Sequence, residues 1–289
     1  MFDGISVALV TPFRAGSVDE PALRRLIRFV LDQGVHGLVL TGSTGETPTL
    51  SHQERDRIWA IGREEVGKPS FLVAGTGTHS TPETIRLTCA AAGRGVDGCM
   101  VVTPYYNKPQ QRGLAAHFRA VADASPVPLL LYNVPSRTGV NLLPETVEEI
   151  SSHPRIVALK EASGSVDQAT DILRRCPITL LSGEDSLTLP LAAVGAKGIV
   201  SVAGHLVGKE MREMLDLFGA GKTEEAAALH RRLYGIIRAL FLETNPAPVK
   251  AALARLGLIE NELRPPLAPV GKETAAVLER EMDALGLGA

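Results

Sequence analysis

The chain has few of the features that mark a disulfide-linked, metal-binding or membrane-spanning protein. Its cysteines, Cys89, Cys99 and Cys176, are an odd number and form no CxxC pattern, which argues against a disulfide framework and a cysteine zinc site. No histidine lies within two to five residues of another, and there is no HExxH string, so we expect no bound metal. No apolar run approaches the roughly 20 residues that a membrane helix needs.

The balance of charge is also unremarkable. The net charge of -2 gives no reason to expect nucleic acid or an anionic membrane as a partner. The N-terminal string MFDGISVALVTPF has no basic segment, and Thr11 and Pro12 interrupt its apolar stretch. It therefore indicates a first strand rather than a signal peptide. We predict a cytoplasmic protein.

Short apolar runs alternate with helical patterns along most of the 289 residues, a length somewhat above the roughly 250 of a (β/α)₈ barrel. Such runs are typical of parallel strands buried on both faces. An open doubly wound sheet is the alternative, but eight units in about 200 residues favour a closed barrel. The eight predicted strands are Val7–Val10, Gly37–Leu40, Phe71–Ala74, Cys99–Val102, Pro128–Tyr132, Ile156–Leu159, Ile178–Leu181 and Ile199–Val202.

Capping signals mark the helices between these strands. Ser51 and Glu54 have the spacing of a capping box, while Thr81 and Leu143 each precede a proline and a glutamate, as at a helix start. After the eighth strand only helices are predicted. We therefore expect an α/β chain with the barrel over residues 1–222 and a C-terminal helical region over 223–289, packed together. The predicted late helices are Lys209–Phe218, Thr223–Glu243, Pro246–Leu256 and Lys272–Leu285.

Polar side chains follow five of the predicted strands at their carboxyl ends, the end at which such barrels carry their active sites. We expect these side chains to meet at one mouth of the barrel. The strings are Thr41–Glu46, Thr103–Asn107, Tyr132–Thr138, Lys160–Glu161 and Ser182–Asp185.

Lys160 is the strongest candidate for chemistry. It follows Ile156–Leu159, an apolar run that should carry it into the barrel. A free lysine has a pKa of about 10.4, and burial lowers that pKa because it disfavours the ammonium form. A buried amine can then attack a ketone. A lysine that reaches past the rim into water is the alternative.

The neighbouring strand ends supply groups that suit the same chemistry. Tyr132 ends the adjacent strand and can exchange protons if hydroxyls such as Ser43, Thr44 and Tyr106 form a relay with it. Taken singly, packing or a turn explains each of the four better than catalysis. The Gly-Ser-Thr-Gly-Glu loop matches no phosphate-binding fingerprint and suits a carboxylate. The planar fork of Arg137 suits a second carboxylate, although a solvated arginine on the rim is equally compatible.

At these residues the chain resembles the pyruvate-dependent class I lyase and aldolase family, which includes dihydrodipicolinate synthases, N-acetylneuraminate lyases and 2-keto-3-deoxygluconate aldolases. The resemblance runs from Val10–Phe13 to Glu243–Lys250. It implies a Schiff base between Lys160 and pyruvate, with Tyr132 as general acid and base, the Gly42–Glu46 loop on the pyruvate carboxylate, and no cofactor.

Two strings point to the dihydrodipicolinate synthase branch, Tyr105–Asn107 and Tyr132–Gly139. The resemblance implies that Tyr106 enters the relay of a neighbouring subunit in a homotetramer built as a dimer of dimers. It also implies pyruvate and L-aspartate 4-semialdehyde as substrates. The substrate-binding residues would be Thr44, Arg137, which holds the semialdehyde carboxylate, Gly183, and Val200 through its backbone carbonyl.

The sequence departs from that branch at three positions. Ser43 stands where the synthases usually carry threonine, and Gly-Ser-Thr-Gly-Glu also occurs among sugar-acid lyases. Arg55 and His79 replace a histidine and an asparagine of the lysine-inhibited enzymes, which predicts weak inhibition by lysine or none. A sibling lyase acting on a 2-keto sugar acid or 4-hydroxy-2-oxoglutarate is one alternative. A barrel that binds a keto acid without catalysis is the other.

Overall fold

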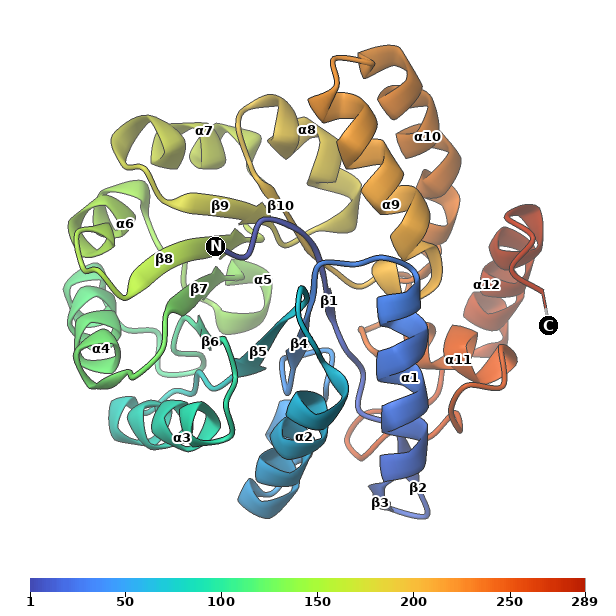
Figure 1. Cartoon of the computed structure of the whole chain (residues 1–289), viewed down its shortest axis with the longest axis horizontal. Coiled ribbons are helices and arrows are strands. Elements are labelled where there is room, and N and C mark those ends of the chain that lie inside the picture. The colour runs from blue at the N-terminus through green and yellow to red at the C-terminus, as the bar shows by residue number, and fades with distance from the viewer. Residues whose placement is uncertain (289) are drawn as a thin grey trace.

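The computed structural model describes residues 1–288, in which eight parallel strands close into a barrel with helices around it (Figure 1). Strand β1 pairs with both β10 and β4, and this double pairing closes the sheet. The predicted (β/α)₈ barrel is confirmed. The strands are β1 (Gly4–Ala8), β4 (Gly37–Leu40), β5 (Phe71–Gly75), β6 (Gly98–Val102), β7 (Leu129–Asn133), β8 (Ile156–Glu161), β9 (Thr179–Ser182) and β10 (Gly198–Ser201).

The helices alternate with these strands and continue after β10. Up to β10 they are α1 (Glu20–Asp32), α2 (His52–Glu65), α3 (Thr81–Gly93), α4 (Gln111–Ala124), α5 (Pro135–Thr138), α6 (Pro144–Ser151), α7 (Val166–Arg175) and α8 (Thr188–Ala193). After β10 come α9 (Gly204–Gly219), α10 (Thr223–Ala239), α11 (Ala247–Arg255) and α12 (Lys272–Ala284). No helix in residues 1–288 is long and apolar enough to cross a membrane.

Every strand of the barrel lies between two apolar layers, which explains the continuous apolar runs of the sequence. Because side chains alternate along a strand, one set faces the helices and the other faces the barrel interior. The interior set is a separate small cluster that includes Ala158 of β8, Leu130 and Tyr132 of β7, and Val200 of β10. The inward direction of Ala158 places Lys160, two residues later, on the same inner face.

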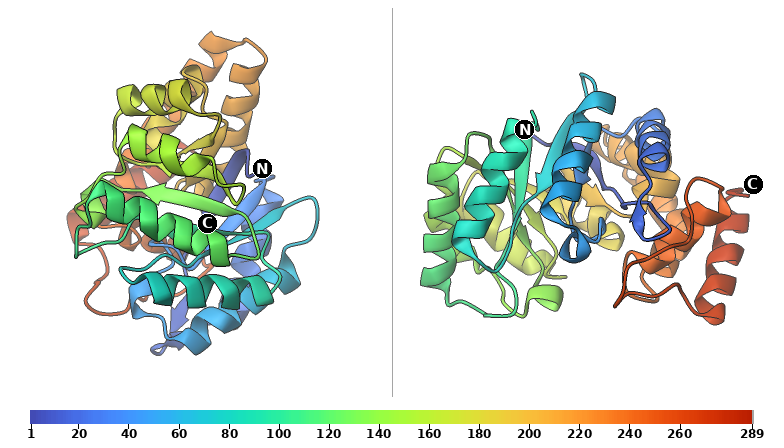
Figure 2. Two further views of the ribbon diagram at one scale, coloured as in Figure 1. Left: turned by 90° about the vertical axis from the view of Figure 1, so that its left-hand side faces the viewer. Right: turned by 90° about the horizontal axis from the view of Figure 1, so that it is seen from below.

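The C-terminal helices continue directly from the barrel, since α10 begins at Thr223 and α9 ends at Gly219. Helix α9 packs on β1, and α10 packs on α9 and α12. Figure 2 shows α11 and α12 as a projection at one side of the barrel, next to the segment that follows β1. The expectation that the late helices pack against the barrel is therefore confirmed.

Several local predictions need correction. The first strand is Gly4–Ala8, three residues earlier than predicted, and α10 ends at Ala239 rather than Glu243. The capping box of Ser51 and Glu54 is present. The N-cap of α3, however, is Ser80, which makes no side-chain capping bond, and the Thr81 hydroxyl is instead hydrogen bonded to the ring of His117 at 2.9 Å. The antiparallel hairpin of β2 (Phe13–Arg14) and β3 (Ser17–Val18) was missed.

Candidate active site

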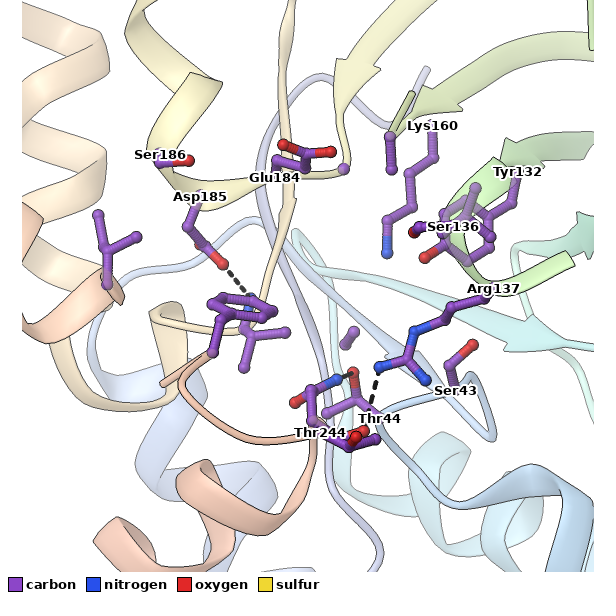
Figure 3. A pocket seen from close by; sticks show the side chains of 18 of the residues that line it. Ser43, Thr44, Tyr132, Ser136, Arg137, Lys160, Glu184, Asp185, Ser186 and Thr244 are labelled. Carbon is purple, nitrogen blue, oxygen red and sulfur yellow. Dashed lines mark hydrogen bonds between the residues drawn. The ribbon is translucent and has the colours of Figure 1, made fainter. Parts of the chain in front are cut away.

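Lys160 and Tyr132 lie side by side inside the barrel. They are paired residues on the neighbouring strands β8 and β7, and only 5% of Lys160 and 6% of Tyr132 are exposed. The Lys160 Nζ lies 4.2 Å from the centroid of the Tyr132 ring. Figure 3 shows both side chains pointing from their strands toward the middle of a cavity. The predicted juxtaposition of the two residues is thus present in this chain.

Burial changes the protonation of both groups. It lowers the pKa of Lys160 to about 8, an effect that Arg137 reinforces and the carboxylate of Asp185 opposes. Burial also raises the pKa of Tyr132 to about 12, although Arg137 acts in the opposite direction. At neutral pH a sizeable fraction of Lys160 is therefore the neutral amine, whereas Tyr132 keeps its proton and can donate it.

The cavity in front of Lys160 has a volume of about 450 Å³ and a mixed polar and apolar lining. Six of the residues predicted for the site line it: Ser43, Thr44, Tyr132, Arg137, Lys160 and Gly183. The structure thus brings together groups from four strand ends. Val200 is buried in the inner core of the barrel and does not line this cavity.

The Gly42–Glu46 loop forms a tight turn at the end of β4. The amides of Gly45 and Glu46 donate to the carbonyls of Gly42 and Ser43, at 3.0 and 3.1 Å. A Cβ on Gly45 would lie 3.2 Å from the carbonyl oxygen of Leu9, so a side chain there would crowd the turn. The loop therefore presents the hydroxyls of Ser43 and Thr44 to the cavity while its backbone packs against the segment after β1.

Arg137 lies on α5, a single turn that the sequence did not reveal. Its guanidinium points toward Thr44 and Thr244 across the cavity (Figure 3), and its Nη2 donates to the carbonyl oxygen of Asn245 at 3.1 Å. Arg137 is an exposed residue, and it lines the cavity in front of Lys160. An anionic group that enters the cavity would meet this cation at the rim.

Tyr106 does not line the cavity in front of Lys160 in this chain. Its side chain is 91% exposed and lines a second cavity of about 720 Å³, which adjoins the first and shares Ser43, Tyr132 and Arg137 with it. Its backbone has a φ of 74°, in the left-handed region that few non-glycine residues adopt. The proton relay through Tyr132, Ser43 and Tyr106 stays a prediction.

Two residues of the site were given no role from the sequence, although Asp185 lies in the predicted strand-end string Ser182–Asp185. Asp185 is buried beside Lys160; it accepts a hydrogen bond from the Val202 amide at 3.0 Å, and burial raises its pKa. Its position in an acidic pair after β9 was the available signal. The Nδ2 of Asn245 donates to the Thr44 hydroxyl at 2.9 Å. Asn245 lies 201 residues from Thr44 in the sequence, so no local pattern could join them.

No group of three or more His, Cys, Asp or Glu side chains that could hold a metal ion is found in residues 1–288. The polar groups around Lys160 are hydroxyls, amides and single charges. Such an arrangement can bind a small carboxylate, form a covalent adduct with its ketone, and supply protons at that carbon.

Comparison with known proteins assigns the chain to a family. Residues 1–285 match the dihydrodipicolinate synthetase family. The 4-hydroxy-tetrahydrodipicolinate synthase of Citrifermentans bemidjiense is 50% identical over 280 residues, 96% of this chain and 97% of the relative. That of Syntrophus aciditrophicus is 47% identical over 99% of both chains. The crystal structure of dihydrodipicolinate synthase from Aquifex aeolicus matches 99% of both chains with a TM-score of 0.97 and 40% identity. The chain belongs to the dihydrodipicolinate synthetase family.

Proposed function

We propose that this chain condenses pyruvate with L-aspartate 4-semialdehyde to 4-hydroxy-tetrahydrodipicolinate, a step of lysine and diaminopimelate biosynthesis. The observation that carries the proposal is the amine of Lys160, which is buried, has a lowered pKa, and faces a cavity that Thr44 and Arg137 also line. The relatives that match nearly the whole chain are 4-hydroxy-tetrahydrodipicolinate synthases. The similarity of this chain to these synthases supports the same reaction for this chain.

The first half of the reaction takes place on Lys160. Its neutral amine attacks C2 of pyruvate, and the resulting carbinolamine loses water to give an imine. Loss of a proton from C3 then gives an enamine, whose electrons the nitrogen has accepted. The hydroxyls of Thr44 and Ser43 lie where they can hold the pyruvate carboxylate. The lysine itself is the electron sink, so the step needs no added cofactor.

Tyr132 is proposed to move the protons of these steps. Its hydroxyl must donate a proton to the departing water and recover one when the enamine forms. The raised pKa of Tyr132, about 12, keeps the group protonated at neutral pH, so it begins each cycle as the acid. Ser43 and Tyr106 would link it to solvent as a relay of hydroxyls.

The second substrate is proposed to bind at the cavity rim. Arg137 would hold its carboxylate while enamine C3 attacks the aldehyde carbon and the new alkoxide takes up a proton. The amino group of the second substrate then attacks the imine carbon and displaces Lys160. The lysine is regenerated and the product ring closes, so one water is lost over the whole reaction.

A sibling reaction with a sugar-derived or glyoxylate-type aldehyde is the second candidate. The Gly-Ser-Thr-Gly-Glu loop does not discriminate between the synthases and the sugar-acid lyases. The test is to incubate the protein with pyruvate and each of L-aspartate 4-semialdehyde, N-acetylmannosamine and glyoxylate, and to measure products by mass spectrometry. We expect a product of the combined mass less one water with the semialdehyde only. Turnover of another aldehyde with none of the semialdehyde would contradict the proposal.

We also propose that Tyr106 completes the relay of a neighbouring subunit in a homotetramer of two dimers. Its support is the exposed side chain of Tyr106, which lines the second cavity and not the cavity of Lys160 in its own chain. We further propose that the chain divides into a barrel over residues 1–222 and a helical region over residues 223–289. The proposed substrates are small metabolites of amino-acid biosynthesis, which supports a cytoplasmic location.

A further inference from the structure

A fully buried ion pair lies directly behind the loop that carries Ser43 and Thr44. Lys250 Nζ donates to the carboxylate of Glu46, and neither side chain has any exposed surface. The same ammonium donates to the carbonyl oxygen of Glu262 at 2.8 Å and lies 4.2 Å from the centre of the Phe13 ring. Burial lowers the pKa of Lys250, and the carboxylate of Glu46 opposes that effect.

Glu46 ends the loop in a conformation that must be held in place. Its φ is 54°, in the left-handed region, which is unfavourable for a residue other than glycine and persists only where the surroundings enforce it. One carboxylate oxygen of Glu46 contacts Lys250, and the other accepts from the Arg264 amide at 3.0 Å. Both oxygens are thus committed to the C-terminal helical region.

The same helix holds the loop at a second point. Lys250 lies on α11, and its amide donates to the carbonyl oxygen of Pro246 at 3.0 Å. Asn245, the residue before Pro246, donates from its side chain to the Thr44 hydroxyl at 2.9 Å. One turn of backbone at the start of α11 therefore fixes both Thr44 and Glu46, two residues apart on the loop.

We propose that Glu46 and Lys250 are positioning residues for the pyruvate site. The pair fixes the left-handed turn that places Thr44 at the substrate carboxylate, so the C-terminal helical region is an integral part of the pyruvate-binding site. This inference rests on the proposed role of the Thr44 loop in pyruvate binding. A buried ion pair contributes little to stability compared with an apolar pair of the same size, whereas removal of one partner leaves a buried charge unpaired. Its geometric role at the loop gives it a function that an apolar pair would not supply.

The test compares Lys250→Met, Glu46→Gln and the double variant with wild type in steady-state kinetics and pyruvate trapping by borohydride. In Lys250→Met we expect KM for pyruvate to rise about 10-fold or more, since misplacing a binding group by about 1 Å can cost up to about 100-fold. The kcat should fall much less, and saturating pyruvate should still label Lys160 completely. The double variant should have a lower KM for pyruvate than Lys250→Met, because it leaves no unpaired carboxylate behind the loop.

The matched control is Met282→Ala, a truncation of a buried side chain in α12, the helix that packs on α10 and α11. It should lower the melting temperature and leave KM for pyruvate unchanged. An equal rise in KM for this control, or an unchanged KM in folded Lys250→Met, would overturn the inference. If Lys250→Met does not fold, Glu46→Gln decides, because it keeps the side-chain shape and removes the charge; an unchanged KM for pyruvate there also overturns it. Wild-type protein that traps pyruvate but does not use the semialdehyde refutes the proposed function and leaves this test intact.

Discussion

The lowered pKa of Lys160 leads to the sharpest prediction for this protein. With a pKa of about 8 in place of 10.5, the neutral amine makes up roughly one tenth of Lys160 at pH 7, against about one part in 3,000 for an ordinary lysine. The difference of 2.5 pKa units between those two values corresponds to about 300-fold more nucleophile. Schiff-base formation at neutral pH depends on this fraction.

Competitive labelling measures the pKa directly. A trace of acetic anhydride, applied between pH 6 and 11, acetylates only neutral amines, and mass spectrometry then reads the peptide that carries Lys160. We expect its labelling to rise with a midpoint near pH 8, with the exposed Lys68 as the internal reference for the reagent. A midpoint above about 10 would show that burial does not lower the pKa and would refute the reasoning.

The identity of the reactive lysine is checked in parallel. Borohydride added in the presence of pyruvate should attach a reduced pyruvyl group to the Lys160 peptide, and Lys160→Ala should fold but show neither adduct nor turnover. An adduct on a different lysine would falsify the mechanism. The control without pyruvate should show no added mass.

The same shift has a stability consequence with a definite sign. The folded state binds the Lys160 proton more weakly than the unfolded state does, so the free energy of unfolding rises with pH between about 8 and 10.5. The full effect is about 3 kcal/mol, present as a penalty below pH 8. Lys160→Met should therefore unfold at higher denaturant concentration than wild type at pH 7, and the difference should shrink as the pH rises from about 8 to 10.5. A variant less stable than wild type at pH 7 contradicts this account.

Three further predictions concern the remaining site residues. Tyr132→Phe should lower kcat about 100-fold or more, the scale of positioned acid–base groups; wild-type activity would remove Tyr132 from the mechanism. Arg137→Ala should raise KM for the semialdehyde while pyruvate trapping stays intact, and equal effects on both substrates would indicate a structural role. Tyr106→Phe and Lys160→Ala should each be nearly inactive, yet mixed oligomers of the two should regain part of the wild-type rate. Background activity in verified mixed oligomers would mean that Tyr106 acts in its own chain.

The barrel could be predicted because its strands are buried on both faces, so each appears in the sequence as a short apolar run. Only the strand ends were uncertain, as at β1, where Gly4 and Ile5 precede the run that was recognised. The hairpin of β2 and β3 was missed because two-residue strands have no period to detect. The turn of α5 was missed for the same reason, although it carries Arg137.

The direction of side chains inside the barrel was a harder inference. A continuous apolar run gives no alternation, so Ile156–Leu159 alone does not say whether Lys160 faces the helices or the interior. The structure decides this through Ala158, an inward residue two positions earlier. The pairing of Lys160 with Tyr132 then follows from the register of β7 and β8, which the sequence does not encode in any local pattern.

The rule that the carboxyl ends of barrel strands carry the site works because all eight ends meet at one mouth, so residues such as Ser43 and Lys160 converge whatever their distance in sequence. The rule does not identify the residues that hold those strand-end residues in position. Asn245 and Lys250 reach the Thr44 loop from α11, in a region predicted only as a helical extension. A local signal did exist, since Lys250 interrupts an otherwise apolar helix face and is fully buried. A charge in such a place needs a partner, and Glu46, acidic at the end of a loop after a buried strand, is the kind of residue to test first. Searching for unpaired charges in apolar segments would therefore extend the strand-end rule from the residues that touch the substrate to those that hold them in position.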